Sequence, residues 1–215
     1  MKKLSIENIQ FIDRYLSHEI IFTDIRAEMV DHVASAIEHK MTDGDSRTFY
    51  YIFKDYMIIN KELLYKTNRK FLRSIDYKAG KRLLKNVFSF KGILIFLVVF
   101  FSFNILENYL QPQQFLKVIK NSPMVILFII GFIYLISIKR RKERFSAIER
   151  LGIYFIIIYQ FIYFFFSIRI KASDFIRENI LLSIIIAAFL ITLTILLLFT
   201  AIQFNKEYKL KFKNV

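Results

Sequence analysis

Five polar side chains of kinds that carry acid–base or metal chemistry fall on one expected helix near the N-terminus. They are Glu28, Asp31, His32, Ser35 and His39, and they lie within about 100° of one another on a helical wheel. Because Glu28 and His32 are four residues apart, one helical turn brings both within reach of one metal ion. The alternative is a structural role, in which His32 borders the apolar face and bonds a carboxylate or a neighbouring helix. We expect the structural role.

The rest of the chain offers little to complete a catalytic site. A zinc protease motif needs histidine at both ends of its five residues, and this chain has no such pair, no phosphate-binding glycine loop and no nucleophile elbow. The absence of cysteine excludes disulfides and thiolate chemistry. We therefore expect no catalytic residue, no metal and no cofactor, and we expect that the protein is not an enzyme.

The charge is unevenly distributed. The net charge is +14, yet residues 1–60 hold 7 basic and 10 acidic residues, a net of −3, and residues 61–91 hold 10 basic and 2 acidic residues, a net of +8. A protein that binds nucleic acid through its N-terminal domain would carry the positive charge there. The pattern argues against nucleic acid and favours a membrane surface as the partner of the basic segment.

The apolar residues are concentrated in four blocks that contain no charged residue: 92–106, 123–138, 151–168 and 180–204. Since about 20 apolar residues span a bilayer core, the blocks predict four transmembrane helices. We place them at about 88–108, 122–138, 150–168 and 179–204, with Asn121 or Ser122 capping the second span and Pro123 in its first turn. A basic tail follows at 206–215.

The positive residues of the short loops predict the orientation. The segment before the first span is strongly basic, and residues 139–150 contain six Lys or Arg, against two in 107–122 and three in 169–179. Positive loops stay in the cytoplasm. The first twenty residues also lack the uninterrupted apolar stretch of a signal peptide. We expect both termini in the cytoplasm, in a multi-pass protein of the cytoplasmic (inner) membrane.

The third and fourth spans each carry a narrow stripe that is expected to face protein. In the third span the stripe is about 100° wide, and small or hydroxylated residues in the fourth allow a close approach of helices. We interpret the two stripes as a helix–helix seam, with a solute path as the minor alternative. The residues are Gly152, Tyr159, Gln160, Tyr163 and Ser167 in the third span, and Ser183, Ala187, Thr194 and Ala201 in the fourth.

Residues 1–60 are expected to form a three-helix head. Ser5, Thr23 and Ser46 are candidate N-caps, and Gly44 marks the turn before the third helix. Residues 61–87 are expected to form a basic linker helix that lies on the membrane surface and contacts anionic lipid head groups. The alternative is a solvated helix docked on the head. The lipid-contacting residues would be Lys66, Arg69, Lys70 and Arg73, opposite the apolar Leu64, Phe71, Leu72 and Ile75.

The run from Asp24 to Val33, which includes Glu28, Asp31 and His32, resembles the HAAS-type helical domain. It is also similar to the helical prefix domains that precede bacterial permease segments. The hallmark is an Asp-His pair in the helix before a turn with glycine, and here that turn holds Gly44. This resemblance implies a cytoplasmic module ahead of membrane spans, often encoded beside PadR-type transcription regulators, and thus a role in signalling or regulation. Phe49, Tyr50 and Tyr51 depart from the smaller residues usual in the family.

These patterns predict an all-α protein with a small cytoplasmic helical head and a four-helix transmembrane bundle. The function that we expect is that of a membrane-anchored regulatory or interaction protein whose head binds a cytoplasmic protein, with a transcription regulator as the partner that the resemblance implies. The alternative is a small transporter or permease subunit without an ionisable site in the membrane. Ion-coupled carriers usually need such a site. Self-association of the chain stays open.

Overall fold

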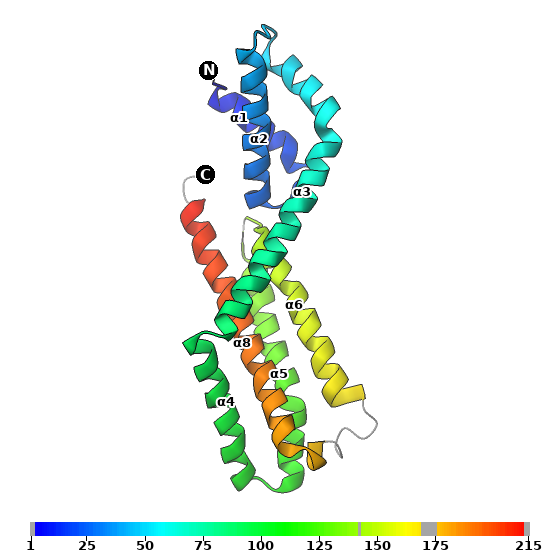
Figure 1. Cartoon of the computed structure of the whole chain (residues 1–215), viewed down its shortest axis with the longest axis vertical. Helices are drawn as coiled ribbons and strands as arrows, with labels where there is room; N and C mark the ends of the chain where they lie inside the picture. Colours follow the sequence, from blue (N-terminus) through cyan, green and yellow to red (C-terminus); the bar gives the residue numbers. More distant parts are fainter. Residues whose placement is uncertain (1–2, 142, 169–175, 213–215) are drawn as a thin grey trace. The chain divides into compact units, whose positions relative to one another are not determined.

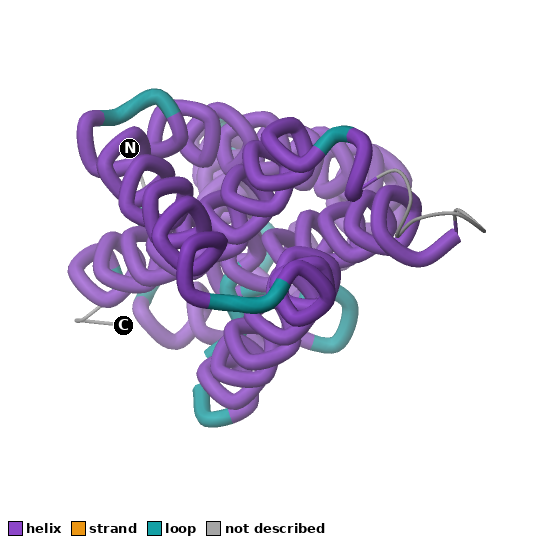
Figure 2. Tube along the Cα trace, turned by 90° about the horizontal axis from the view of Figure 1, so that it is seen from below, coloured by secondary structure: helices purple, strands orange, loops and turns teal. Residues whose placement is uncertain are grey.

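The computed structural model describes residues 3–141, 143–168 and 176–212, apart from the side chains of Ser167 and Ile168. Every element in these ranges is a helix (Figures 1 and 2), which confirms the predicted all-α class. The helices are α1 (Ile6–Ser17), α2 (Thr23–Thr42), α3 (Phe49–Val87), α4 (Phe90–Tyr109), α5 (Pro112–Lys139), α6 (Ser146–Tyr163) with a π-helical turn η1 (Phe164–Ile168), and α8 (Ile180–Lys211).

The chain forms two compact units. We call the first the head; it comprises Met1–Tyr77 together with Lys142–Ser146. The second, which we call the membrane unit, comprises Lys78–Arg141 and Ala147–Val215. It contains four helices that are long and apolar enough to cross a membrane, and the protein is therefore a multi-pass membrane protein.

The head is built around one apolar core between α1, α2 and the first part of α3. Ser5 caps α1, because its hydroxyl oxygen accepts the Asn8 N–H at 3.2 Å. Gly44, at φ +104°, makes the turn after α2 in a backbone conformation that side chains with a Cβ rarely adopt. The fully buried side chains of this core are Ile12, Ile25, Met29, Val33, Ile37 and Ile52.

Two helix starts in the head differ from prediction. Thr23 is the first residue of α2 and does not cap it, since Phe22 occupies the N-cap position without a side-chain hydrogen bond. The third helix begins at Phe49 and not next to Ser46, and the Thr48 carbonyl accepts the Tyr51 N–H at 3.1 Å. The Arg47 N–H donates to the Asp45 carboxylate at 3.1 Å, so the side chain of Asp45 binds the backbone two residues on, as is common in turns before a helix.

The third head helix and the linker helix are one element. The sequence placed a boundary between them at 60–61, whereas α3 runs without interruption from Phe49 to Val87. The physical reason is that no glycine or proline occurs between Phe49 and Ala79, so nothing in that stretch ends a helix. The head therefore extends to Tyr77, and the last turns of α3 belong to the membrane unit.

The membrane unit is centred on α8, which packs against α4 and α5 and buries much of its length. The turn from α3 to α4 needs Gly92, because a Cβ there would lie 2.3 Å from the Asn86 carbonyl oxygen. Ser89 caps α4 by accepting the Gly92 N–H at 3.1 Å. In the last turns of α3, the Asn86 amide donates to Thr200 Oγ1 at 2.9 Å and Arg82 lies 2.7 Å from Glu207 Oε1. These contacts fasten the end of α3 to α8.

The predicted N-cap of the second transmembrane helix is wrong. Asn121, Ser122 and Pro123 lie inside α5, which begins at Pro112. Pro112 fixes the first turn, and the polar residues that follow continue the same helix. Pro123 removes a single backbone donor, a loss that membrane helices tolerate. The helix that contains the fourth span continues beyond the predicted end of that span, to Lys211.

Candidate functional site

The polar cluster of α2 lies on the surface of the head. Glu28, Asp31 and His32 are exposed, while their chain neighbours Met29, Val30 and Val33 are buried in the core. The His32 ring lies 6.4 Å from the ring of Phe71 on α3. No hydrogen bond or ion pair joins Glu28 or Asp31 to another described residue. These side chains therefore contribute little to the fold of the head.

The described residues contain no group of three or more histidine, cysteine, aspartate or glutamate side chains that could hold a metal ion. His32 and Glu28 are one turn apart, and no third ligand joins them from the part of the chain that the structure describes. His39 instead pairs with Asp43, at 2.7 Å between Nδ1 and Oδ2, at the C-terminal end of α2. A cation there is favoured by the helix dipole. The cluster is an exposed polar face suited to contacts with another molecule.

The start of α2 makes a contact that was not predicted from the sequence. The Asp24 carboxylate accepts the Ser146 N–H at 3.0 Å and also the Ser146 hydroxyl. The Thr23 N–H donates to the Arg144 carbonyl at 2.9 Å, and the Arg144 guanidinium lies 5.7 Å from the centre of the Phe22 ring. We call this set of contacts the clasp. It holds the segment between α5 and α6 within the head.

The clasp is also an N-cap supplied from a distance. Ser146 is the first residue of α6, so its N–H has no acceptor within that helix. Asp24 provides the acceptor from a position 122 residues away along the chain. A carboxylate is favoured at the start of a helix because the helix dipole is positive there. The N-terminal ends of α2 and α6 are thus fixed by one side chain.

A second polar network stiffens the turn between α2 and α3. Arg47 binds Asp45, at 2.8 Å, and Asp55, at 2.6 Å. The hydrogen bonds from Arg47 lower the pKa of Asp45 to about 2, and the two carboxylates raise the pKa of Arg47. On the other side of the head, the hydrogen bond from Tyr65 and then that from Lys61 lower the pKa of Glu19. Both networks are structural, because every charge in them has a partner.

The basic face of α3 is exposed at Lys66, Arg69, Lys70 and Arg73. The apolar side chains on the opposite face are half-buried and pack against the core of the head; they are Leu64, Phe71, Leu72 and Ile75. The apolar face of α3 is therefore covered by protein, as in the alternative in which the linker helix docks on the head. Contact of the four cations with anionic lipid stays a prediction.

The two stripes that were predicted to form a seam in the membrane unit have different surroundings. The four residues on α8, namely Ser183, Ala187, Thr194 and Ala201, are all buried. On α6, Gly152 lies beside Tyr134 of α5, and a Cβ added to it would be 3.5 Å from the Tyr134 hydroxyl oxygen. Tyr159 is half-buried, whereas Gln160 and Tyr163 are exposed. The side chain of Ser167 lies outside the described residues.

The buried face of α6 is aliphatic rather than polar. It consists of Leu151, Ile158 and Ile162, which are buried on the side of α6 opposite Gln160. Gln160 and Tyr163 of the polar stripe are therefore outside the packed face of α6, while Gly152 of the same stripe lies beside α5. The wheel pattern alone could not decide this, because in a membrane helix both an apolar and a polar face can pack against protein.

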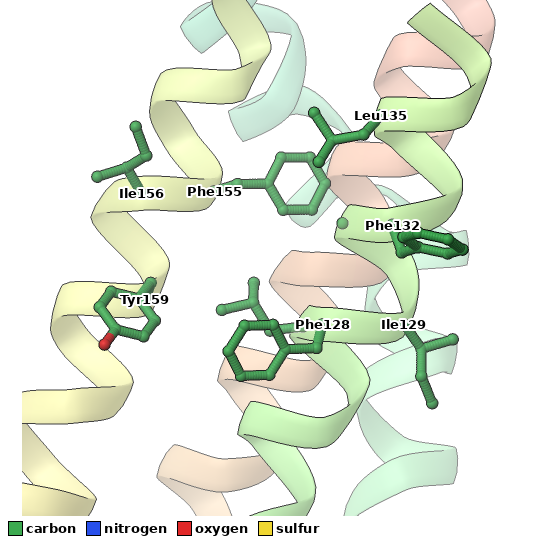
Figure 3. A pocket seen from close by; sticks show the side chains of 9 residues that line it. Phe128, Ile129, Phe132, Leu135, Phe155, Ile156 and Tyr159 are labelled. Carbon is green, nitrogen blue, oxygen red and sulfur yellow. The ribbon is translucent and has the colours of Figure 1, made fainter. Parts of the chain in front are cut away.

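An apolar groove of about 630 Å³ separates α5 from α6 in the membrane unit. Phe155 of α6 points across it toward Leu135 of α5, and the Tyr159 hydroxyl points away from α5 (Figure 3). A second apolar pocket, of about 390 Å³, lies between α6 and α8. Their walls can accept hydrocarbon, and they provide almost no polar group to bind a solute. Neither resembles a catalytic site.

Comparisons with known proteins give no relative. No protein-family model, no curated protein and no solved structure matches this chain. The resemblance of the head to HAAS-type domains therefore stays a prediction from the residues of α2.

Proposed function

We propose that this protein is a membrane-anchored regulatory or interaction protein whose helical head binds a cytoplasmic protein. The observation that carries the proposal is the exposed polar face of α2, with Glu28, Asp31 and His32. These side chains lie outside the core of the head, and Glu28 and Asp31 have no partner among the described residues. Exposed polar residues that the fold does not use are suited to recognition of another molecule.

The proposed location is the cytoplasmic (inner) membrane, with both termini in the cytoplasm. It is supported by the six Lys or Arg residues of 139–150 and by the basic segment before α4. In this orientation the head and the α5–α6 segment that it holds are on the same side. The clasp is consistent with this, because it joins Asp24 of the head to Ser146 at the start of α6.

The partner that we propose is a protein rather than a nucleic acid. Residues 1–60 carry a net charge of −3, which would repel phosphate groups. The resemblance of α2 to HAAS-type domains adds a transcription regulator as the specific partner. Basic or hydrogen-bonding side chains on the partner would complement Glu28 and Asp31. The exposed cations of α3 are proposed to contact anionic lipid beside this site.

The alternative is a small transporter or permease subunit. It receives less support, because the groove between α5 and α6 and the pocket between α6 and α8 are lined almost entirely by apolar side chains. A third cavity, of about 550 Å³, has the polar residues Glu107 and Arg177 in its lining, but it lies at the end of the α4 and α5 helices rather than along them. A solute pathway needs polar groups that replace the water around the solute. Flux of a solute through purified protein in vesicles would favour this alternative.

The proposal can be tested by photo-cross-linking in living cells. A photoreactive amino acid is placed at Asp31 or Ser35 in the full chain, and at exposed Lys54 of α3 as the matched control. We expect illumination to link the α2 positions to one protein of defined mass, which mass spectrometry identifies. The control position should give little of that product. Equal yields at all three positions, or no product at Asp31 and Ser35, would contradict the proposal.

A further inference from the structure

One face of α6 has the spacing of a coiled-coil seam and is not used within the chain. Ile153, Ile156, Gln160 and Tyr163 follow one another at intervals of three, four and three residues, which is the a/d pattern of paired helices. Ile153 is 46% exposed, Ile156 62% and Tyr163 41%, and Gln160 is exposed as well. The face that α6 buries against its own chain is the opposite one.

Gln160 is the residue of this face whose side chain is unfavourable in contact with lipid. The candidate span runs from Ser146 to Phe166, so Gln160 lies six residues, or about 9 Å, inside its end. No described side chain or carbonyl forms a hydrogen bond with its amide. An amide without a hydrogen-bond partner is costly in hydrocarbon, and glutamine in membrane helices usually bonds across to another helix.

We propose that this face of α6 binds the same face of a second copy of the chain, with Gln160 hydrogen-bonded to Gln160 of that copy. The amide has one donor group and one acceptor group, so it is complementary to itself. Two copies in one membrane have the same orientation, which makes the paired helices parallel and brings the two Gln160 residues to the same depth. A single polar residue at an a position is known to fix such pairing.

The neighbouring residues fit this partner. The isoleucines at 153 and 156 provide the apolar contacts on one side of Gln160, and Tyr163 follows on the other. Tyr159, which adjoins this face, is held by its own chain, because its ring stacks on that of Tyr163 at 6.0 Å and 11°. Gln160 and Tyr163, two residues of the α6 stripe predicted from the sequence, would then contact protein in a second copy. This inference does not depend on the identity of the partner of the head.

The absence of cysteine from the chain allows a direct test with single-cysteine variants of the full protein in membranes. Ile153→Cys, Ile156→Cys, Gln160→Cys and Tyr163→Cys report on the proposed face. Ile157→Cys and Phe161→Cys are matched controls, since they are exposed at similar depths on another face of α6. We expect oxidation to give disulfide-linked dimers several-fold more efficiently at the four positions than at the controls. Equal yields at both sets would overturn the proposal.

The role of the amide is tested separately by the dimer affinity of purified full-length protein in lipid nanodiscs or detergent. Gln160→Leu should weaken dimerisation by about 3- to 30-fold, the range of one or two interhelical hydrogen bonds, and Gln160→Asn should weaken it less. Circular dichroism checks that the variants remain helical. A wild-type protein that is monomeric at all concentrations, or Gln160→Leu with unchanged affinity, would overturn the proposal.

Discussion

Asp24 shows how a single side chain can connect distant parts of this chain. Its carboxylate binds the N–H and the hydroxyl of Ser146, which begins α6. Because Asp24 lies in the first turn of α2, its position depends on that helix. A partner that moves the start of α2 would therefore also move the cap of α6.

We predict that Asp24→Ala loosens the start of α6. Loss of an N-cap acceptor costs about 1 kcal/mol, which corresponds to about fivefold faster hydrogen exchange of the amides that it protects. Exchange of the peptide that covers residues 143–150 in the full-length protein measures this. Asp24→Asn keeps one acceptor oxygen and should have a smaller effect. Asp31→Ala is the control, and an equal change in that variant would show that the effect is not due to the cap.

His32 illustrates what residue types alone can settle. The spacing of Glu28 and His32 permits a metal site, yet a metal needs further ligands from other elements. In the structure the element facing His32 presents Phe71, which cannot act as a ligand. The sequence predicted a half-buried His32 bonded to a carboxylate or to a neighbouring helix, whereas its side chain is exposed and forms no hydrogen bond or ion pair with another described residue. Which side chain lies beside His32 depends on the register in which α3 packs against α2.

At the scale of elements, α3 has two faces with different surroundings. Leu64, Phe71, Leu72 and Ile75 pack on the head, and the basic side chains on the other face are exposed. An exposed cation near anionic lipid contributes about 1 kcal/mol, and this attraction fades beyond a Debye length of about 8 Å at physiological salt. The basic face is therefore the part of α3 that is suited to a membrane surface.

We predict that the basic face contacts anionic lipid in a salt-dependent way. A spin label on Lys70→Cys in the full-length protein should become less accessible to a water-soluble relaxing agent in anionic nanodiscs than in neutral ones. High salt should remove the difference, because it screens the charges. Lys66→Glu, Arg69→Glu and Arg73→Glu together should also remove it. A label at exposed Tyr51 of the same helix is the control, and equal protection there would contradict a contact specific to this face.

The whole molecule consists of two compact units, the head and the membrane unit. The end of α3 is fastened to α8 by Asn86 and Arg82, and the 142–146 segment belongs to the head. Four apolar helices make the membrane unit a multi-pass structure. The proposed orientation then assigns the α4–α5 turn to the outer side.

We predict that reporter fusions after Leu110 and after Ile170 are active outside the cytoplasm and that a fusion at the C-terminus is active inside. The reason is the excess of Lys and Arg in 61–91 and 139–150, which the membrane potential and anionic lipids keep in the cytoplasm. Alkaline phosphatase and a fluorescent protein report the two sides. With four spans and a cytoplasmic head, the C-terminus must also lie in the cytoplasm. A C-terminus found outside would therefore contradict this topology.

The sequence by itself determined the class of this protein and most of its elements. Apolar blocks of membrane-spanning length identify four spans, because no soluble core requires so much uninterrupted apolar surface. The Ser5 cap and the Gly44 turn were also predictable, since each depends on neighbouring residues only. The start of α5 was not, because two prolines could each begin a helix and the polar stretch between them carries no clear boundary signal.

Only the tertiary structure decided which faces are covered. The basic helix could have buried its apolar side in lipid, and its docking on the head follows from the position of α2. The polar stripe of α6 could have formed a seam with α8, but α6 buries its aliphatic side instead. The clasp between Asp24 and Ser146 depends on residues 122 positions apart. A local pattern specifies which side chains share a face, whereas the element that meets that face is chosen by the competition of all faces for burial.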